Sequence, residues 1–391
     1  MQPRRDPVVL ILYARYGAGH IQVAEALQQA FEKNGAARVV LLDLFRESHP
    51  WVDAASKFLY RKSFTLFPTL YGWTYYRTKD MSHDRLMSRH FNSFGLPTLK
   101  KSIEAVQPDL VINTFPMLAM PEFRRQTGQR IPTFAVLTDF VLHNRWIHPE
   151  IDKYYVATDD LAEQLFQKGV LPHQVVVSGI PIRQGFQRAQ DLLEEKHELA
   201  RRYQLTPQKR KVLLSAGGYG VSWNWLEIIQ SFAEQDWEVL VACGNNEAMR
   251  SDLLLKTAPL ADVHIFGYLP HIEELMKTAD LLVTKAGGIT LAEALSLQLP
   301  ILILSPVPGQ ELENARYLEA KGAARVVRTR EDLAEIKHLL QKDELLSSLV
   351  QTNHTPLGQQ NSAERVVADM KTSWKEGMTS RVLHQALPAH P

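Results

Sequence analysis

The sequence predicts an α/β protein built from two doubly wound, Rossmann-like domains in tandem, with a cleft between them. Short apolar runs recur along the chain, and each is followed by a turn rich in glycine, proline or aspartate. Segments whose apolar residues have helical spacing separate these runs. Near-continuous apolar strands are typical of a parallel sheet that is buried on both faces. Ligands of such sheets bind beyond the carboxyl ends of the strands, where the turns converge.

The order of these elements also predicts the domain boundaries. The apolar run 8–13 leads into the glycine turn 17–20, and residues 21–34 then have helical spacing. Further strands are expected at 38–42, 110–113, 132–137, 153–157, 174–178, 211–215, 238–243, 263–266, 280–284 and 300–304. A charged helical stretch interrupts this alternation once, which marks a boundary. The predicted segments are an N-terminal domain at 1–185, a linker at 186–210, a second domain at 211–356, a C-terminal helix at 357–376 and a disordered tail at 377–391.

The composition excludes several classes of protein. Of the 391 residues, 45% are apolar and 22% are charged, which is typical of a folded globular chain. The 44 basic residues nearly balance the 43 acidic ones, which argues against a protein that binds nucleic acid through bulk charge. The one cysteine, Cys243, cannot form an intramolecular disulfide, which favours a reducing, cytosolic setting. No apolar run reaches the ~18 residues of a membrane-spanning helix, and no Cys/His cluster has the spacing of a zinc site.

One strand–turn–helix segment has the features of a nucleotide site. A strand is expected to end at Thr284, and Gly287 and Gly288 then let a ligand approach the backbone closely. A helix is expected to begin near Thr290, whose hydroxyl can cap it, so that free amides and the positive helix end suit a diphosphate. Glu293, about one turn further, can accept hydrogen bonds from a ribose diol. A plain joint with a surface glutamate is the alternative interpretation.

The next turn, residues 307–315, suggests a sugar site. Prolines and a glycine stiffen it, and Gln310 and Glu311 then open a helix. An adjacent amide and carboxylate offer donors and acceptors that match the hydroxyls of a sugar. The alternative is a Pro-Gly turn with an ordinary acidic first helical turn.

These two segments resemble part of a known enzyme family. With Phe266-Gly267-Tyr268, Tyr16-Gly17-Ala18-Gly19-His20 and Leu137-Thr138-Asp139-Phe140, they are similar to the bacterial processive diacylglycerol glucosyltransferases and the plant monogalactosyldiacylglycerol synthases, which are inverting enzymes of the GT-B group. The likeness covers nearly the whole chain. Ala18 stands where many bacterial members have asparagine, and Ala286 where many have proline. These departures bear on the sugar and its stereochemistry and leave the class unchanged.

The resemblance implies a GT-B fold and the transfer of a hexose from a UDP-sugar to the hydroxyl of diacylglycerol. Single displacement would invert the anomeric carbon and give a β-glycosyl diacylglycerol, with glucose favoured, galactose as the alternative, and repeated additions allowed. It implies neither a metal nor another cofactor, since the UDP-sugar is a substrate. The residues implied to bind the donor are Gly218 and Gly220 beside the diphosphate, Phe266, Gly267, Tyr268 and Leu269 at the uracil, Gly287, Gly288 and Thr290 at the diphosphate, Glu293 at the ribose, and Gln310 and Glu311 at the hexose.

His20 is, by the same resemblance, the catalytic base that faces the cleft. A neutral imidazole can accept the proton of the acceptor hydroxyl, and the positive end of the first helix favours the neutral form. A histidine that only stabilises the turn is the alternative. Asp139 follows a predicted strand at the same cleft and is expected to orient His20 or to bind the acceptor, with a helix-capping role as the alternative. The residues expected on the acceptor side are Gly19, Trp146 and His148.

Residues 51–79 predict contact with a membrane surface. Aromatic and basic side chains alternate there, which suits the headgroup zone of an anionic bilayer. Diacylglycerol leaves a bilayer only at a cost of ~0.8 kcal/mol per exposed CH₂, so we expect a peripheral enzyme at the cytoplasmic face of the cell membrane. Its expected partners are UDP-hexose, diacylglycerol or glycosyl-diacylglycerol and an anionic membrane surface, without nucleic acid. The residues expected at the membrane are Phe64, Phe67, Trp73, Tyr75 and Tyr76. Helices packed on the first sheet, with solvated basic residues, are the alternative.

Three other functions stay open at this point. A peptidoglycan-lipid UDP-N-acetylglucosamine transferase would use another lipid acceptor, although the aromatic segment and the Gly-Ala-Gly-His turn argue against it. A UDP-sugar 2-epimerase would turn over the nucleotide sugar without any lipid. A non-catalytic UDP-sugar sensor would bind the donor without turnover under any lipid condition.

Overall fold

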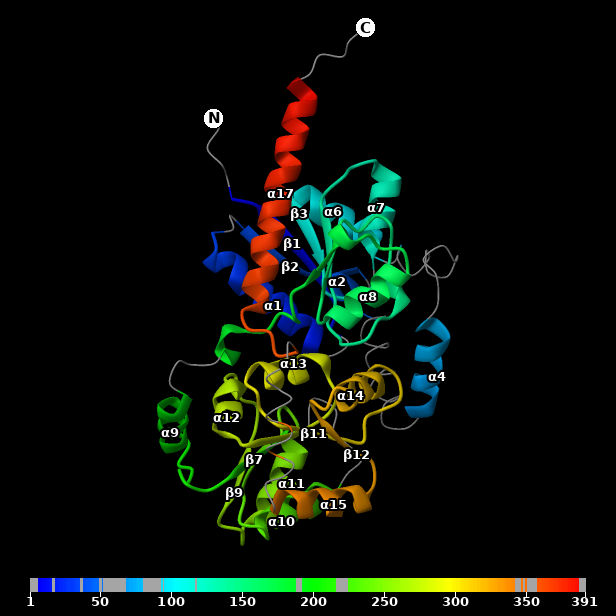
Figure 1. Cartoon of the computed structure of the whole chain (residues 1–391). Coiled ribbons are helices and arrows are strands. Elements are labelled where there is room, and N and C mark those ends of the chain that lie inside the picture. The colour runs from blue at the N-terminus through cyan, green and yellow to red at the C-terminus, as the bar shows by residue number, and fades with distance from the viewer. Residues whose placement is uncertain are drawn as a thin grey trace.

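The computed structural model consists of two α/β halves, stacked along the long axis of the molecule in Figure 1. The structure describes residues 6–15, 18–35, 38–48, 51, 68–79, 93, 95–116, 118–187, 192–215, 224–341, 346, 349 and 357–386. Each half contains one six-stranded sheet with helices around it. The predicted α/β fold of two doubly wound domains is therefore confirmed.

The first sheet is parallel throughout and has the order β2-β1-β3-β4-β5-β6. Its strands are β1 (Val8–Tyr13), β2 (Arg38–Asp43), β3 (Leu110–Asn113), β4 (Thr133–Val136), β5 (Lys153–Val156) and β6 (Val175–Val177). The helices of this half are α1 (Ala18–Lys33), α2 (Leu44–Ser48), α4 (Pro68–Lys79), α6 (Leu96–Val106), α7 (Ala119–Thr127), η1 (Asn144–Trp146), α8 (Asp159–Gln167), η2 (Pro172–Gln174) and η3 (Gln184–Phe186). Strands β3 and β4 are buried along their whole length, as their apolar sequences predict.

The second sheet is also parallel and has the order β12-β11-β10-β7-β8-β9, the strand order of dinucleotide-binding folds. Its strands are β7 (Lys211–Ser215), β8 (Glu238–Ala242), β9 (Val263–Phe266), β10 (Leu281–Thr284), β11 (Ile301–Leu304) and β12 (Arg325–Val327). The helices are α9 (Leu192–Arg202), α10 (Trp225–Ala233), α11 (Glu247–Thr257), α12 (Ile272–Thr278), α13 (Gly288–Ser296), α14 (Gln310–Ala320) and α15 (Arg330–Gln341). Strand β12 was not predicted, because a three-residue edge strand that begins with an exposed arginine has no clear apolar run.

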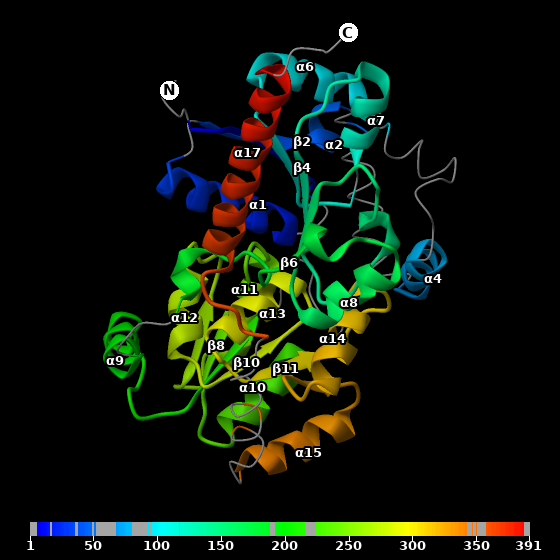
Figure 2. The same ribbon diagram turned by 45° about the horizontal axis from the view of Figure 1, so that its top comes forward.

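The C-terminal helix α17 (Ser362–Ala386) returns to the first half and runs beside α1, as Figures 1 and 2 show. Asp369 on this helix accepts hydrogen bonds from Lys153 Nζ at 2.9 Å and from the Tyr155 hydroxyl at 2.8 Å, both on β5. The helix extends to residue 386, past the helix end expected at residue 376. The physical reason is that the first proline after the predicted helix end is Pro388, which leaves the preceding residues free to propagate the helix.

Two glycines let the halves meet closely. A Cβ atom at Gly19 on α1 would lie 3.0 Å from the Ile289 side chain on α13, and a Cβ at Gly288 would lie 2.2 Å from the Thr138 carbonyl oxygen. Larger residues at either position would push the two halves apart. Within the described ranges, each helix is either too short or too polar to cross a bilayer.

Candidate active site

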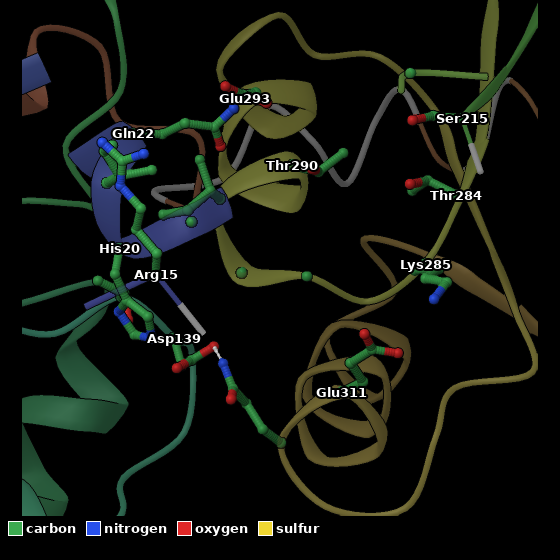
Figure 3. Close-up of a pocket in the computed structure, with 18 of the residues that line it drawn as sticks. Arg15, His20, Gln22, Asp139, Ser215, Thr284, Lys285, Thr290, Glu293 and Glu311 are labelled. Atoms are coloured by element: carbon green, nitrogen blue, oxygen red, sulfur yellow. Dashed lines mark hydrogen bonds between the residues drawn. The ribbon is translucent and has the colours of Figure 1, made fainter. Parts of the chain in front are cut away.

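A cavity of about 1350 Å³ lies between the two halves. Both sheets reverse their strand order beside it, between β1 and β3 in the first half and between β7 and β10 in the second. Crevices at such reversal points bind ligands, and this volume exceeds the ~300–1,000 Å³ of most small-molecule sites. Side chains from both halves converge on the cavity in Figure 3. It therefore has room for more than one small ligand.

The first turn of α13 forms one wall of the cavity through Gly287, Gly288 and Thr290. The helix begins at Gly288. The residue before it, Gly287, has no side chain that could cap the helix. The predicted start near Thr290 is therefore wrong by part of a turn, and the Thr290 hydroxyl lies inside the helix instead of capping it. The Leu291 N–H makes a helical bond to the Gly287 carbonyl at 3.0 Å. The N–H groups of residues 288–290 come before this first helical bond and therefore have no acceptor within the helix. Together with the positive end of the helix dipole, they favour the binding of an anion.

Glu293 lies one turn further along α13 and is only 4% exposed, yet it lines the cavity. Burial raises the pKa of its carboxyl group to about 8, the Arg183 guanidinium lowers it, and Glu273 raises it. Arg183 forms an ion pair of 3.1 Å with Glu273. Near neutral pH the Glu293 carboxyl group therefore holds a proton in the ligand-free protein, and it can exchange hydrogen bonds with a neutral diol.

Lys285 and Glu311 form a second part of the wall and lie near each other in Figure 3. Burial lowers the pKa of the Lys285 amino group, and the Glu311 carboxylate raises it. Burial likewise raises the pKa of Glu311, and Lys285 lowers it. Oε2 of Glu311 is buried and has no hydrogen-bond partner among the described residues. This oxygen can accept a hydrogen bond from a ligand hydroxyl.

His20 lines the cavity from the first turn of α1, which packs against the start of α13 through Gly19 and Ile289. Its Nδ1 atom lies 2.7 Å from the Thr114 carbonyl oxygen, which follows β3. Because a carbonyl oxygen only accepts, this contact assigns the proton to Nδ1 and leaves the lone pair on Nε2. Burial lowers the pKa of His20, while Asp139 and the Thr114 bond raise it. The imidazole is therefore neutral, as expected from the sequence, although burial is the largest cause.

Asp139 connects the two halves. Its Oδ1 atom accepts a hydrogen bond from Gln310 Nε2 at 2.5 Å and one from Asn314 Nδ2 at 2.9 Å. Burial raises the pKa of the Asp139 carboxyl group, and hydrogen bonds from these two amides lower it. Among the described contacts, the ring of His20 is oriented by Thr114 and not by a hydrogen bond to Asp139. The carboxylate instead joins the turn after β4 to the start of α14.

Most of the predicted site residues that the structure describes lie on the cavity wall. These are Gly19, His20, Tyr75, Asp139, Trp146, Gly267, Tyr268, Leu269, Gly287, Gly288, Thr290, Glu293, Gln310 and Glu311. Gly218, Gly220, Phe64 and Phe67 lie outside the described residues.

Four described residues of the prediction do not line the cavity. His148 stabilises its own turn, since its Nδ1 accepts the Glu150 N–H at 3.1 Å. Phe266 stacks on His264 on the same strand, with 6.4 Å between ring centroids. Trp73 and Tyr76 lie on α4, with 58% and 40% of their surface exposed.

The structure adds residues that the sequence did not single out. Arg15, Thr138, Arg183 and Lys285 line the cavity, and Asn314 lies behind it. Lys285 directly follows β10 and Arg15 lies two residues after β1, so their positions just past the carboxyl ends of strands could have indicated a place at the site. The places of Arg183 and Asn314 depend on how the halves pack together, which sequence spacing does not reveal.

Comparisons with known proteins identify the two halves separately. The family model described as "Monogalactosyldiacylglycerol (MGDG) synthase" matches residues 20–182. The model described as "Glycosyltransferase family 28 C-terminal domain" matches residues 223–370. The boundary between the matches lies close to the boundary between the two sheets.

Similar proteins include solved structures and curated relatives. The UDP-GlcNAc 2-epimerase of Neisseria meningitidis, bound to UDP-GlcNAc, has a TM-score of 0.59 at 14% identity and covers 93% of this chain and 99% of its own. MurG of Acinetobacter baumannii has a TM-score of 0.58 at 15% identity with the same coverage. At such identities the likeness shows the fold alone.

Relatives named processive diacylglycerol beta-glucosyltransferase, from Bacillus cereus (strain ATCC 14579) and Bacillus thuringiensis (strain Al Hakam), are each 44% identical over 87% of this chain and 87% of their own length. Identity at this level over this length, with both family models in the matching order, confirms the resemblance inferred from the motifs. The chain therefore belongs to the glycosyltransferase family 28 enzymes that include the processive diacylglycerol beta-glucosyltransferases.

Proposed function

We propose that this protein transfers a hexose from a UDP-sugar to the hydroxyl group of diacylglycerol, with inversion at the anomeric carbon. The observation that carries the proposal is that His20 and the first turn of α13 line the same cavity. A base that faces an anion site is what an alcohol needs to displace a diphosphate leaving group directly. The curated relatives are named for diacylglycerol as the acceptor and for a β-linked glucose as the product.

On the donor side, the amides of the first turn of α13 bind the diphosphate and stabilise the charge that develops on departing UDP. Glu293 binds the ribose diol, and the backbone of residues 267–269 contacts the uracil. Gln310 and Glu311 bind the hexose, for which the buried Oε2 of Glu311 supplies an acceptor. Glucose is the favoured hexose because of the names of the relatives, and galactose differs from it only at the 4-hydroxyl group.

On the acceptor side, His20 removes the proton from the attacking hydroxyl group. The oxygen of diacylglycerol forms a bond to the anomeric carbon while the bond from that carbon to the diphosphate breaks. The proton moves to Nε2 of His20, and the electron pair of the broken bond leaves with UDP. Thr114 holds the ring in the required tautomer. Asp139 acts as a positioning residue, because it fixes Gln310 relative to the first half.

The same proposal needs no metal ion and no further cofactor. The positive end of α13 and the amino group of Lys285 lie on the cavity wall and supply positive charge for the diphosphate. Calorimetric titration of UDP in the presence of a chelator tests this part, since binding should be unchanged.

The protein meets its acceptor at an anionic membrane surface, through helix α4. Trp73 is 58% exposed on this helix, and the Arg77 guanidinium lies 5.2 Å from the centre of its ring. An exposed aromatic ring beside a basic group suits the headgroup zone of a bilayer. This surface would hold the enzyme on the cytoplasmic face of the membrane as a peripheral protein.

The direct test is incubation with labelled UDP-glucose or UDP-galactose and with diacylglycerol in anionic vesicles, followed by separation of the lipids. We expect the label in a glycosyl diacylglycerol, with glucose preferred and with the β configuration by the NMR coupling of its anomeric proton. Vesicles without diacylglycerol serve as the control. Conversion of the UDP-sugar without any lipid would support an epimerase instead, and transfer only from UDP-N-acetylglucosamine to a peptidoglycan lipid would also contradict the proposal.

A further inference from the structure

Helix α4 belongs to the first half, but it rests on the second half beside α14 in both Figure 1 and Figure 2. Gly72 of α4 packs against Pro308 in the turn 307–309, which immediately precedes Gln310 and Glu311, and Tyr76 bonds to Glu313 on α14. The turn lies between the two halves, and α4 contacts it from the first half.

The contact between α4 and this turn is tight. A Cβ atom at Gly72 would lie 2.6 Å from Cβ of Pro308, so only a glycine fits at this position without displacing the turn. Gly309 follows with φ of 108°, a backbone conformation that favours glycine. The helix and the turn therefore meet where Gly72, which has no side chain, packs against Pro308.

Polar contacts extend this interface along α14. The Tyr76 hydroxyl donates to Glu313 Oε1 at 2.9 Å, and the Gly309 N–H donates to the same hydroxyl. Lys79 Nζ lies 3.4 Å from Glu313 Oε2. Burial alone would raise the pKa of Glu313, but Tyr76, Lys79 and Arg316 lower it below its ordinary value. The carboxylate is therefore held in its ionised form at the end of α4.

A second face of α4 contacts the first half. The Tyr75 ring packs edge-on against His143, with 5.1 Å between centroids, and Thr78 Oγ1 lies 3.4 Å from His143 Nε2. His143 directly precedes η1, whose Trp146 lines the cavity. The helix thus connects the acceptor wall of the cavity to the turn that carries the proposed hexose site.

We infer that Tyr76, supported by Gly72, is a positioning residue that holds the 307–311 turn in the geometry in which Gln310 and Glu311 bind the donor hexose. The inference rests on the proposed function for two assignments, that of these two residues to the hexose and that of residues 267–269 and α13 to the nucleotide. Uridine and diphosphate bind elsewhere, at residues 267–269 and on α13. Loss of the Tyr76 contact therefore weakens binding of the hexose and leaves binding of the nucleotide unchanged.

The test is calorimetric binding of UDP-glucose and of UDP to wild-type full-length protein and to Tyr76→Phe. A neutral hydrogen bond contributes ~0.5–1.5 kcal/mol, equivalent to roughly a two- to tenfold change in an equilibrium constant. We expect the Kd of UDP-glucose to rise by about this factor and the Kd of UDP to stay the same. Gly72→Ala should have the same selective effect by displacing Pro308, and it should be larger.

The matched control is Tyr317→Phe. Tyr317 lies on the same helix α14, and its hydroxyl also bonds across the two halves, to Asp160 Oδ2 at 2.7 Å, away from the turn. This variant should leave the ratio of the two Kd values unchanged. The inference is overturned if Tyr76→Phe binds UDP-glucose as wild type does, if it weakens UDP and UDP-glucose equally, or if Tyr317→Phe reproduces its effect.

The proposed function fails in a different way. Wild-type protein would then bind UDP-glucose no differently from UDP, or would make no glycolipid in the vesicle assay, irrespective of Tyr76.

Discussion

Asp139 in the first half is joined to Asn314 in the second, with Oδ1 of the carboxylate 2.9 Å from the amide Nδ2. The Asn314 side chain is fully buried, accepts the Phe140 N–H at 3.0 Å and also donates to the Ala286 carbonyl at 3.2 Å. One amide therefore connects the turn after β4 with the turn that precedes α13. Through this connection, the half that carries His20 is fixed relative to the amides at the start of α13.

Removing the Asp139 carboxylate should loosen this connection. In Asp139→Ala, the buried amide of Asn314 and the partly buried amide of Gln310 lose their shared acceptor, and a buried group left unsatisfied costs about 1–3 kcal/mol. We expect a lower melting temperature and a higher KM for UDP-glucose, because Gln310 loses a partner that holds it. Differential scanning calorimetry and steady-state kinetics measure the two effects.

The conservative variant separates the hydrogen bonds from the charge. Both amides donate to the same oxygen, Oδ1, so Asp139→Asn can keep both bonds through its amide oxygen. This variant should retain most of the stability and most of the donor affinity that Asp139→Ala loses. Equal losses of stability and donor affinity in the two variants would show that these properties depend on the charge of Asp139 and not on its two hydrogen bonds.

Replacing His20 should abolish transfer and spare donor binding. A positioned general base contributes about 10²–10⁴-fold to rate, so kcat of His20→Ala should fall by that range. The Kd for UDP should stay at the wild-type value, because the amides of α13, and not His20, bind the diphosphate in the proposed function. His173→Ala, which changes an exposed histidine on η2, is the matched control and should be fully active. An active His20→Ala enzyme would require another base.

The pH dependence of kcat should reflect the lowered pKa of His20. The base must be neutral to accept a proton, and burial lowers its pKa below the ordinary value near 6.5. With both substrates saturating, we therefore expect kcat to stay constant as the pH falls from 8 through 6.5, and to decline only below that. A decline centred above pH 7 would contradict the assignment of His20 as the base in this environment.

Glu293 should couple donor binding to proton release. Its pKa is raised to about 8, so the ligand-free carboxyl group is protonated below that pH, and a ribose diol that donates two hydrogen bonds favours the ionised form. Binding of UDP-glucose should strengthen as the pH rises toward 8 and level off above it. Calorimetry at pH 7 in buffers of different ionisation enthalpy should detect the released proton.

Glu293→Gln provides the control for this coupling. The substitution keeps a polar side chain of similar size and removes the titration, so binding should become weaker and independent of pH between 6 and 8.5. UDP-glucose is the suitable ligand because, unlike UDP, it has no terminal phosphate group, whose pKa is about 6. Unchanged pH dependence in the variant would place the titrating group elsewhere.

The strands and the donor segment could be predicted from the sequence because their signals are local. The apolar run that ends at Thr284, the glycine pair and Glu293 are contiguous, and the parallel sheet brings them to the edge where ligands bind. The predicted start of α13 was too late because the residue before the helix is Gly287, which has an extended backbone and no side chain. A prediction that places a hydroxyl side chain at the helix start therefore selects Thr290 instead. Strand β12 was missed because its partner β11, and not its own sequence, defines it.

The contacts across the cavity could not be predicted in this way. Asp139 and Asn314 are far apart in sequence, and only the packing of two glycine-lined surfaces brings them together. The same is true of Tyr76 and Glu313. His148, which the sequence assigns to the acceptor side, bonds to its own turn and does not line the cavity, and its spacing from the site residues does not reveal this placement.

A crystal structure of the protein with UDP tests the proposed donor site most directly. We expect diphosphate oxygens within ~2.7–3.2 Å of the amides in the first turn of α13, the ribose at Glu293, and His20 facing the space that the hexose would occupy. A UDP molecule bound away from α13, or a His20 side chain turned into packed interior, would contradict this expectation.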